Sequence, residues 1–359
     1  MKQSSPVILH HKYSLEDGHV TKQITSVEGF RGMMIVRKAK EYRKSTPFKS
    51  VITLKELKSN PQFLKQANVV AFHIHHGSQT TKYEFLKEKY GLPMFVGFRG
   101  NDATAFPRKK KNLKQLKRLF KTADMFFPVC EHLKRRIMQL GCPEDKIRVL
   151  YGGLDLNRFE YRPRKLDSQD NIRFLAVGRF VEKKGFHHLL RAFAKVRKTH
   201  KNITLTLIGR GPYETEYARL INKLNLKKNV EMVPWVDYQK IQSKYYSSHI
   251  FCAPSITDQN GNQEGIPNTL KEAMATGMPV ISTTHAGIPE LVKNNVSGLL
   301  VPEGSVKQLE KAMKWLIEHP EQWAKFGENA RKKVEADFNL AIQLKKQKEF
   351  YNEVLLKQQ

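Results

Sequence analysis

In the second half of the chain, short apolar runs alternate with longer segments whose apolar residues recur at helical spacing. The short runs are rich in β-branched residues, which is typical of strands buried on both faces of a parallel sheet. This pattern predicts an α/β fold with helices on both sides of the sheet. We expect strands over 172–179, 203–209, 229–236, 249–255 and 279–284, and helices over 187–200, 213–226 and 268–276.

The first half shows the same alternation less regularly. Strands are predicted over 6–10, 32–38, 69–75, 94–100, 125–130 and 147–153, and helices over 20–29, 80–90, 111–122 and 131–140. Between the halves, 160–171 is polar and lacks periodicity, so it is the best linker. The sequence thus predicts two Rossmann-like domains facing across a cleft. We expect an N-terminal domain over 1–165, a second domain over 166–335 and a terminal helix over 336–359.

Length and composition agree with two domains. A chain of 359 residues is longer than a domain with a single hydrophobic core usually is, and 40% apolar residues are enough to build two cores. No apolar run reaches the roughly 18–20 residues that span a bilayer, and the first apolar stretch is too short for a signal peptide. Three cysteines without a C-x-x-C pair indicate a reducing compartment, with neither a disulfide framework nor a zinc site.

The charge is the unusual bulk property: 63 basic against 34 acidic residues, a net charge of +29. The densest run, 108–121, has apolar positions at helical spacing and no acidic residue, which predicts a basic amphipathic helix. A solvated surface and docking on an anionic membrane explain it about equally well, and nucleic-acid binding less well, since no known nucleic-acid module accompanies it. The membrane hypothesis assigns contacts to Arg108, Lys109, Lys110, Lys111, Lys114, Lys117, Arg118 and Lys121.

The stretch "NQEGIPNTLKEAMATGMPV" places two carboxylates, Glu264 and Glu272, around a predicted helix start. In doubly wound folds, ligands lie beyond the carboxyl ends of strands, where helix amino termini attract anions. Gly265 lets the backbone approach a ligand, and Asn268 or Thr269 can begin the helix. Carboxylates flanking an anion suit hydroxyl groups, and a nucleoside diphosphate sugar has hydroxyls on both sides of its phosphates. A helix-dipole glutamate beside an unrelated surface glutamate remains the alternative.

A second motif strengthens the ligand hypothesis. In "VGRFVEKKGF", Arg179 ends a strand and Lys184 precedes a helix. Two such cations can neutralise a diphosphate leaving group without a metal ion. The sequence contains no Asp-x-Asp, the usual carboxylate pair for Mg²⁺ or Mn²⁺, so we expect no metal and no other cofactor.

These motifs resemble the carboxyl-terminal domain of family 4 glycosyltransferases, which have the GT-B fold. The resemblance covers 172–305 and includes "LIGRGP", "APSITDQNGNQEGIPNTLKEAMATGMPVISTTHAGIPELV" and "SGLLVP". In the first half, "FHIHHGSQ", "GFRGNDAT" and "LYGGLDLNRF" are similar to bacterial colanic-acid and amylovoran exopolysaccharide transferases. The last helix looks like the terminal helix of that family, which crosses back to the first domain.

The resemblance implies a role for each matching position. Arg179 and Lys184 would bind the donor diphosphate, Glu264 the transferred sugar and Glu272 the ribose. These three residues, Arg179, Lys184 and Glu264, are the expected catalytic set of a retaining, metal-independent reaction. The remaining donor contacts would come from Gly209, Gly211, Trp235, Val236, Gly265, Ile266, Pro267, Asn268, Thr269 and Leu270, with Trp235 and Val236 near the base and the amides of Thr269 and Leu270 near phosphate.

The first domain departs from the family pattern. Arg99 stands where many relatives have a histidine near the donor sugar, and Asp102 either faces a substrate or caps its own loop. Only Gly18 is available in the loop that usually carries a glycine-rich turn. His75 could contact the acceptor or donor, although packing and local hydrogen bonds are favoured for the 73–76 histidines.

The leading hypothesis is a retaining glycosyltransferase that moves a hexose from a nucleotide-diphosphate sugar to a glycan acceptor during the synthesis of bacterial surface polysaccharide. We expect this acceptor to be lipid-linked. We expect the enzyme in the cytoplasm, peripheral on the inner face of the cell membrane, with no nucleic-acid partner. A nucleotide-sugar 2-epimerase of the same fold and a non-catalytic polyanion binder are the alternatives. The base, UDP or GDP, the acceptor, the linkage and the oligomeric state are not readable from the sequence.

Overall fold

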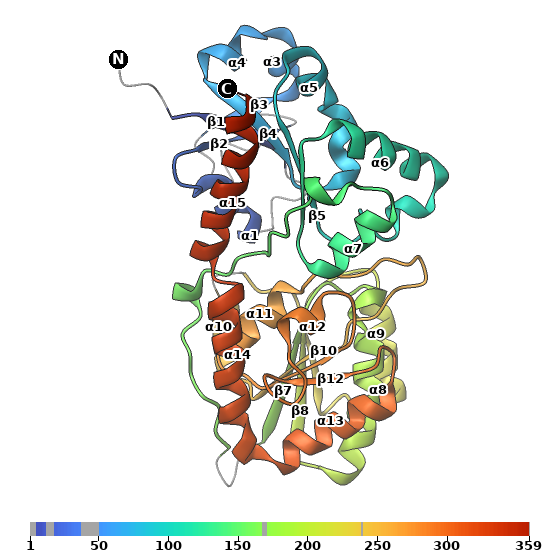
Figure 1. Ribbon diagram of the computed structural model, residues 1–359. Helices are drawn as coiled ribbons and strands as arrows, with labels where there is room; N and C mark the ends of the chain where they lie inside the picture. Colours follow the sequence, from blue (N-terminus) through green and yellow to red (C-terminus); the bar gives the residue numbers. More distant parts are fainter. Residues whose placement is uncertain (1–4, 12–17, 37–49, 167–170, 238–239, 359) are drawn as a thin grey trace. The chain divides into compact units, whose positions relative to one another are not determined.

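The computed structural model describes residues 5–11, 18–36, 50–166, 171–237 and 240–358 (Figure 1). The chain forms two compact units. Unit 1 consists of Met1–Gly153 and Leu340–Gln359, and unit 2 of Leu154–Asn339. Each unit contains one six-stranded sheet in which all described strand pairs are parallel.

The strands of unit 1 lie in the order β3-β2-β1-β4-β5-β6. Their bounds are Val7–His11 (β1), Arg31–Val36 (β2), Val51–Thr53 (β3), Val69–Ile74 (β4), Met94–Phe98 (β5) and Met125–Pro128 (β6). The helices are Gly18–Thr25 (α1), Leu54–Ser59 (α3), Gln62–Gln66 (α4), Glu84–Tyr90 (α5), Lys110–Thr122 (α6), Glu131–Gln139 (α7) and Leu340–Leu355 (α15).

Unit 2 has the strand order β12-β11-β10-β7-β8-β9. Its strands are Ile172–Val177 (β7), Ile203–Ile208 (β8), Val230–Val233 (β9), Ile250–Ala253 (β10), Val280–Thr283 (β11) and Leu299–Val301 (β12). Its helices are Phe186–Thr199 (α8), Glu214–Lys223 (α9), Ile241–Tyr246 (α10), Asn268–Ala275 (α11), Ile288–Leu291 (α12), Val306–Glu318 (α13) and Trp323–Asp337 (α14). These two sheets are the Rossmann-like domains that the alternating pattern predicts.

Each unit has its own apolar core. In unit 2, Phe174 and Leu205 of neighbouring strands pack with Phe193 of α8 and Leu309 of α13. In unit 1, Tyr351 of α15 packs with side chains from β1, β4 and β5 and is fully buried. Burial of apolar area of this kind is the main favourable term in folding, so α15 is integral to unit 1.

The units divide at Gly153/Leu154 and Asn339/Leu340, whereas the sequence places the boundaries near 165 and 335. The expected linker accounts for most of the difference. Its residue Arg164 is buried and donates hydrogen bonds to the carbonyls of Ser248, Tyr245 and Thr276. A buried guanidinium with these partners ties 154–166 to unit 2, despite the polar composition that favours a linker.

Several predicted elements differ from the structure. The predicted helix 20–29 is α1, which ends at Thr25, and the predicted helix 80–90 is a 3₁₀ turn followed by α5. The predicted strand 147–153 is irregular, with a bridge from Ile147 to Phe126 of β6. The short outer strands β3 and β12 were not predicted, because three residues are too few to show a periodicity.

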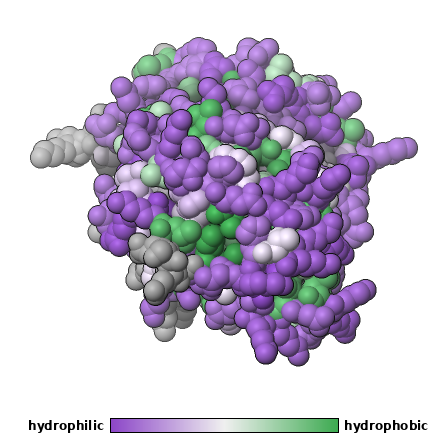
Figure 2. Space-filling model, turned by 90° about the horizontal axis from the view of Figure 1, so that it is seen from below, coloured by the Kyte–Doolittle hydropathy of each residue, from purple (hydrophilic) through white to green (hydrophobic). Residues whose placement is uncertain are grey.

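No helix within the described residues is long and apolar enough to cross a bilayer. Figure 2 shows one face of the molecule, on which hydrophilic residues predominate around a smaller apolar area.

Candidate functional site

Most of the candidate residues of unit 2 lie beyond the carboxyl ends of β7, β8 and β10. At the ends of β7 and β8, the backbones of Gly178 and Gly209 lie against each other. A Cβ atom on Gly209 would lie 1.9 Å from the carbonyl oxygen of Gly178, and one on Gly211 would lie 2.4 Å from that of Phe180. Only glycine permits this close approach, so backbone atoms rather than side chains border the site here.

Lys184 is held over the end of β7 by a tight turn. Its neighbour Gly185 has φ +65°, and a Cβ atom there would lie 1.9 Å from the carbonyl oxygen of Pro254. The stem of Lys184 passes over Gly178, where a Cβ atom would lie 3.2 Å from the lysine Cε. Arg179, the other predicted cation, is exposed at the same strand end. The structure therefore places both predicted cations beside the glycines.

Glu264 is buried, with 9% of its surface exposed, and its carboxylate meets two lysines. Its Oε1 atom lies 3.0 Å from Nζ of Lys184 and 3.5 Å from Nζ of Lys183. Burial alone would raise the pKa of the Glu264 carboxyl, but the two ammonium groups outweigh it and hold this pKa well below its usual range. Glu264 is therefore ionised at neutral pH and bound to cations.

Lys183 is a site residue that sequence reasoning missed. It is buried, and burial lowers the pKa of its ammonium while Glu264 partly offsets this effect. Nζ of Lys183 also lies 3.4 Å from the carbonyl oxygen of Gln263, next to Glu264. The signal in the sequence was the doublet "KK", of which only the second lysine matches the family motif.

Helix α11 begins against β7. The hydroxyl of Thr269 donates to the carbonyl of Val177 at 3.1 Å, and no side chain caps the helix start. The amide of Leu270 donates to the Pro267 carbonyl at 3.2 Å, so it already has an acceptor within the chain. Ile266 and Asn268 are half-buried beside the buried Gly265 and Pro267.

Glu272 lies one turn inside α11 and is buried. Its Oε2 atom accepts a hydrogen bond of 2.6 Å from the hydroxyl of Tyr245. The carboxylate is thus fixed from α10, the helix that Arg164 also contacts through the Tyr245 carbonyl. Trp235 and Val236 follow the edge strand β9, which pairs with β8, and Trp235 is 55% exposed.

In unit 1, Asp102 caps its own loop. Its Oδ1 atom accepts from the amides of Arg99 and Gly100, and its Oδ2 atom accepts from the amide of Gly77. These three bonds support the loop-capping alternative for Asp102. Arg99 donates to the carbonyl of His75 at 3.1 Å and to Oε1 of Gln23 at 3.2 Å, so its guanidinium is engaged within unit 1.

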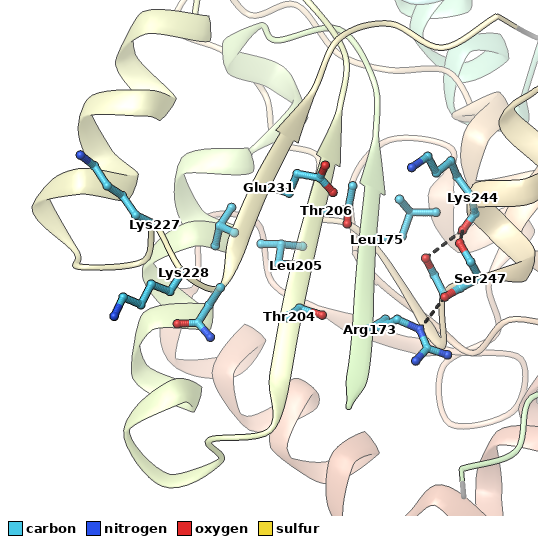
Figure 3. Close-up of a pocket in the computed structure, with 13 residues that line it drawn as sticks. Arg173, Leu175, Thr204, Leu205, Thr206, Lys227, Lys228, Glu231, Lys244 and Ser247 are labelled. Atoms are coloured by element: carbon cyan, nitrogen blue, oxygen red, sulfur yellow. Dashed lines mark hydrogen bonds between the residues drawn. The ribbon is translucent and has the colours of Figure 1, made fainter. Parts of the chain in front are cut away.

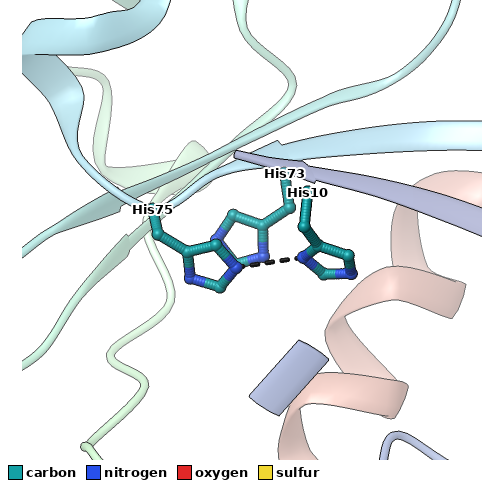
Figure 4. A group of neighbouring side chains, drawn as sticks. All are labelled: His10, His73 and His75. Carbon is teal, nitrogen blue, oxygen red and sulfur yellow. Dashed lines mark hydrogen bonds between the residues drawn. The ribbon is translucent and has the colours of Figure 1, made fainter. Parts of the chain in front are cut away.

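Three histidines stand on one face of β1 and the end of β4 (Figure 4). Nδ1 of His10 and Nε2 of His75 share a hydrogen bond of 3.0 Å, and Nδ1 of His73 lies 2.7 Å from the Tyr351 hydroxyl. The rings of His73 and His75 stack at 3.9 Å. One nitrogen of each ring lies within 4.8 Å of the others, so a metal ion bound to all three would have to replace the His10–His75 hydrogen bond. We therefore describe them as buried hydrogen-bonding groups, which is the favoured expectation for 73–76.

Gly18 is the first residue of α1, while most of the loop before it lies outside the described residues. The predicted basic helix is α6. Its apolar residues Leu116, Leu119 and Phe120 are buried in unit 1. The cations of α6 and of the two residues before it are exposed: Arg108, Lys109, Lys110, Lys111, Lys114, Lys117, Arg118 and Lys121. Arg118 pairs with Glu84 and Glu88 of α5.

A pocket of about 470 Å³ lies elsewhere in unit 2, on the face of β7, β8 and β9 (Figure 3). It is lined by Arg173, Thr204 and Thr206 together with Lys228 and Lys244. None of the candidate residues lines it. The pocket is therefore separate from the site around Glu264.

The chain matches two family models of glycosyltransferases. Residues 28–158 match the model of Glycosyltransferase Family 4, and residues 157–333 match that of Glycosyl transferases group 1. The chain belongs to the glycosyltransferase family that these two models describe. The family assignment by resemblance is confirmed.

Among curated relatives, the putative colanic acid biosynthesis glycosyltransferase WcaL of Escherichia coli is 34% identical over 64% of this chain and 56% of that protein. The amylovoran biosynthesis glycosyltransferase AmsK of Erwinia amylovora is 32% identical over 74% of this chain and 65% of that protein. The matched part of the chain thus spans less than two thirds of either relative.

Among solved structures, HepE of Anabaena in complex with UDP-glucose has a TM-score of 0.80 at 17% identity, over 97% of this chain and 99% of that chain. Sucrose-phosphate synthase of Thermosynechococcus elongatus has a TM-score of 0.79 at 18% identity, over 98% of this chain and all of that chain. At these identities the likeness concerns the fold, and it confirms the predicted two-domain GT-B class.

Proposed function

We propose that this protein is a retaining, metal-independent glycosyltransferase of surface polysaccharide synthesis. It takes a hexose from a nucleotide-diphosphate sugar and transfers it to a lipid-linked glycan at the inner face of the cell membrane. The names of the colanic acid and amylovoran relatives support the pathway, and the UDP-glucose complex of HepE supports the class of donor.

One observation carries the proposal: a buried carboxylate, Glu264, is held by Lys183 and Lys184 beside bare glycine backbone. The donor diphosphate competes with Glu264 for the ammonium of Lys184. Once Lys184 binds phosphate, the Glu264 carboxylate is released to accept hydrogen bonds from the sugar hydroxyls. The ion pair thus keeps the Glu264 carboxylate and the Lys184 ammonium both charged, as they must be to bind the sugar hydroxyls and the diphosphate.

In the reaction, the bond between the anomeric carbon and the β-phosphate oxygen breaks. The acceptor oxygen attacks the same face of the sugar and passes its proton to the departing phosphate. Negative charge grows on the diphosphate, and the cations of Arg179, Lys183 and Lys184 stabilise it. This electrostatic role explains how the residues present could support transfer without a metal ion.

A thermal-shift screen tests the proposal. UDP-, GDP- and dTDP-sugars are added with EDTA to the wild type, to Glu264→Gln and to Glu318→Gln, a control in which an exposed histidine-paired carboxylate of α13 is changed. A ligand that binds only the native state raises the melting temperature, by an amount equivalent to about 2.7 kcal/mol at 100 times Kd. We expect one donor to stabilise the wild type and the control, and to stabilise Glu264→Gln less.

If no donor shifts the melting temperature, the proposal is rejected. Anomeric proton couplings in the product then test the stereochemistry, and an inverted product contradicts a retaining reaction. Conversion of the donor in the absence of any acceptor would instead indicate the 2-epimerase.

A further inference from the structure

The carboxylate of Glu303 anchors both ends of the loop that carries Glu264, one end directly and the other through His285. Its Oε2 atom accepts a 2.7 Å hydrogen bond from the amide of Thr257, at the start of the loop. Its Oε1 atom lies 2.7 Å from Nδ1 of His285. Nε2 of His285 lies 3.0 Å from the amide of Glu264, at the end of the loop.

These contacts fix the proton on His285. A backbone amide can only donate, so Nε2 of His285 must accept with its lone pair. The ring is then neutral with its proton on Nδ1, and Nδ1 donates to Glu303. His285 is fully buried after β11, and Glu303 follows β12. Burial would raise the pKa of Glu303, but the bonds from His285 and Thr257 outweigh it and lower this pKa, which keeps both oxygens as acceptors.

A second contact makes the same connection. The amide of Gly287, two residues after His285, donates to the carbonyl of Gly265 at 3.2 Å. The segment after β11 therefore holds the Glu264–Gly265 backbone through one donor and one acceptor. The loop has other anchors, since the Ile256 amide donates to the Lys183 carbonyl and the Gln259 amide to Glu182. Glu303 is distinct among these contacts because it links to Glu264 itself.

We propose that Glu303, acting through His285, is a positioning residue that sets Glu264 and the 257–264 loop for the donor sugar. This inference rests on the proposed function for its role in transfer. Glu303 itself does not touch the reacting groups. It supplies two acceptor oxygens, and the geometry of the loop requires both.

The substitution Glu303→Gln isolates this requirement. A glutamine keeps the shape but offers one acceptor oxygen, and its other end is an amide donor. If the oxygen faces His285, the amide meets the Thr257 N–H; if it faces Thr257, the amide meets the Nδ1–H of His285. Either way one end of the loop is released. Glu318→Gln breaks a comparable carboxylate–histidine pair, 3.3 Å long, on the exposed surface of α13 and is the matched control.

Two measurements on the full chain test the inference. Without donor, hydrogen exchange of peptides spanning 257–264 should be faster in Glu303→Gln than in the wild type and in Glu318→Gln. With donor, kcat should fall about 10- to 100-fold, the scale of a misplaced catalytic group, while the Kd of the free nucleoside diphosphate stays within about twofold. His285→Gln, which can still accept from the Glu264 amide, should retain more activity than His285→Phe.

Unchanged exchange in Glu303→Gln would overturn the inference. A parallel loss of nucleoside diphosphate affinity would also overturn it, because it would indicate a general structural defect. If the wild type uses no nucleotide sugar, the proposed function fails, and the exchange measurement still decides whether Glu303 positions the loop.

Discussion

At the scale of single residues, the structure shows Glu264 paired with the ammonium groups of Lys183 and Lys184, for which the proposed donor diphosphate would compete. Glu264 and Lys184 match the family motif, and the sequence therefore pointed to both. Lys183 and Glu303 could not be found in this way, because their importance depends on which strand ends lie side by side. A buried carboxylate needs paired cations to stay ionised, and only the fold shows that Lys183 supplies one of them.

Gly209→Ala should weaken donor binding. The new methyl group would lie 1.9 Å from the carbonyl oxygen of Gly178, so the backbone at the ends of β7 and β8 must separate. We expect at least a tenfold higher Kd for the nucleoside diphosphate, measured by titration calorimetry. Gly141→Ala is a control on the surface of unit 1, at a glycine whose Cβ direction is open but whose φ of +99° carries the same kind of backbone cost. Equal affinities for Gly209→Ala and the wild type would contradict the close approach.

The buried histidines predict an acid-sensitive unit 1. Burial lowers the pKa of His10 from 6.5 to about 3 and also lowers that of His73. Below pH 6.5 these histidines bind protons in the unfolded chain but remain neutral in the native state. The free energy of unfolding therefore falls as pH falls from 6.5 toward 3. The slope is about 1.4 kcal/mol per pH unit for each such histidine.

Urea unfolding between pH 5 and 7 measures this slope, and His10→Gln should make it shallower. His132→Gln, on α7 of unit 1 and outside the cluster, is the control. A slope that is the same in His10→Gln and the wild type would show that His10 does not resist protonation.

At the scale of elements, periodicity predicted most of the buried strands and several helices, among them α6 and α8, but it did not identify the long helices α13 and α14. The short outer strands β3 and β12 escaped it, and so did the irregular segment after Ile147. The expected linker shows the same limit. Its polar composition favours a solvated segment, yet a single arginine, Arg164, finds buried carbonyl partners that no local pattern reveals.

The hydroxyl of Tyr351 on helix α15 should contribute to the free energy of unfolding. The Tyr351 hydroxyl lies 2.7 Å from Nδ1 of His73 and accepts a 2.7 Å hydrogen bond from Gln347. Tyr351→Phe leaves these two buried groups without that partner, at a cost of about 1–3 kcal/mol of unfolding free energy. Urea unfolding checks the value, with Tyr90→Phe as a surface control outside this network. A change below about 0.5 kcal/mol would contradict the role of this bond.

At the scale of the whole molecule, the net charge of +29 and the exposed cations of α6 support docking on an anionic membrane. The apolar side of α6 is buried in unit 1, so this docking would be electrostatic rather than by insertion. Each cation near an anionic surface contributes about 1 kcal/mol. The effect should therefore be strongly salt-dependent.

Changing Lys110, Lys111, Lys114 and Lys117 to glutamine should weaken binding to phosphatidylserine vesicles by about 100-fold or more at low salt. Co-sedimentation measures this affinity. The matched control changes four exposed lysines of unit 2, Lys198, Lys227, Lys228 and Lys307. Equal losses in both variants would assign the binding to overall charge and contradict a role for α6.

The central claim is that Lys184 binds the donor diphosphate while Glu264 binds the sugar. Titration calorimetry of the nucleoside diphosphate and of the full donor, on the wild type, Lys184→Met and Glu264→Gln, tests it most directly. We predict that Lys184→Met weakens the nucleoside diphosphate by about 10- to 150-fold, the equivalent of 1.5–3 kcal/mol for a charged hydrogen bond. Glu264→Gln should leave the nucleoside diphosphate as tight or tighter, because Lys184 is freed, and should lose the extra affinity of the sugar. Equal weakening of both ligands by Glu264→Gln would contradict the account.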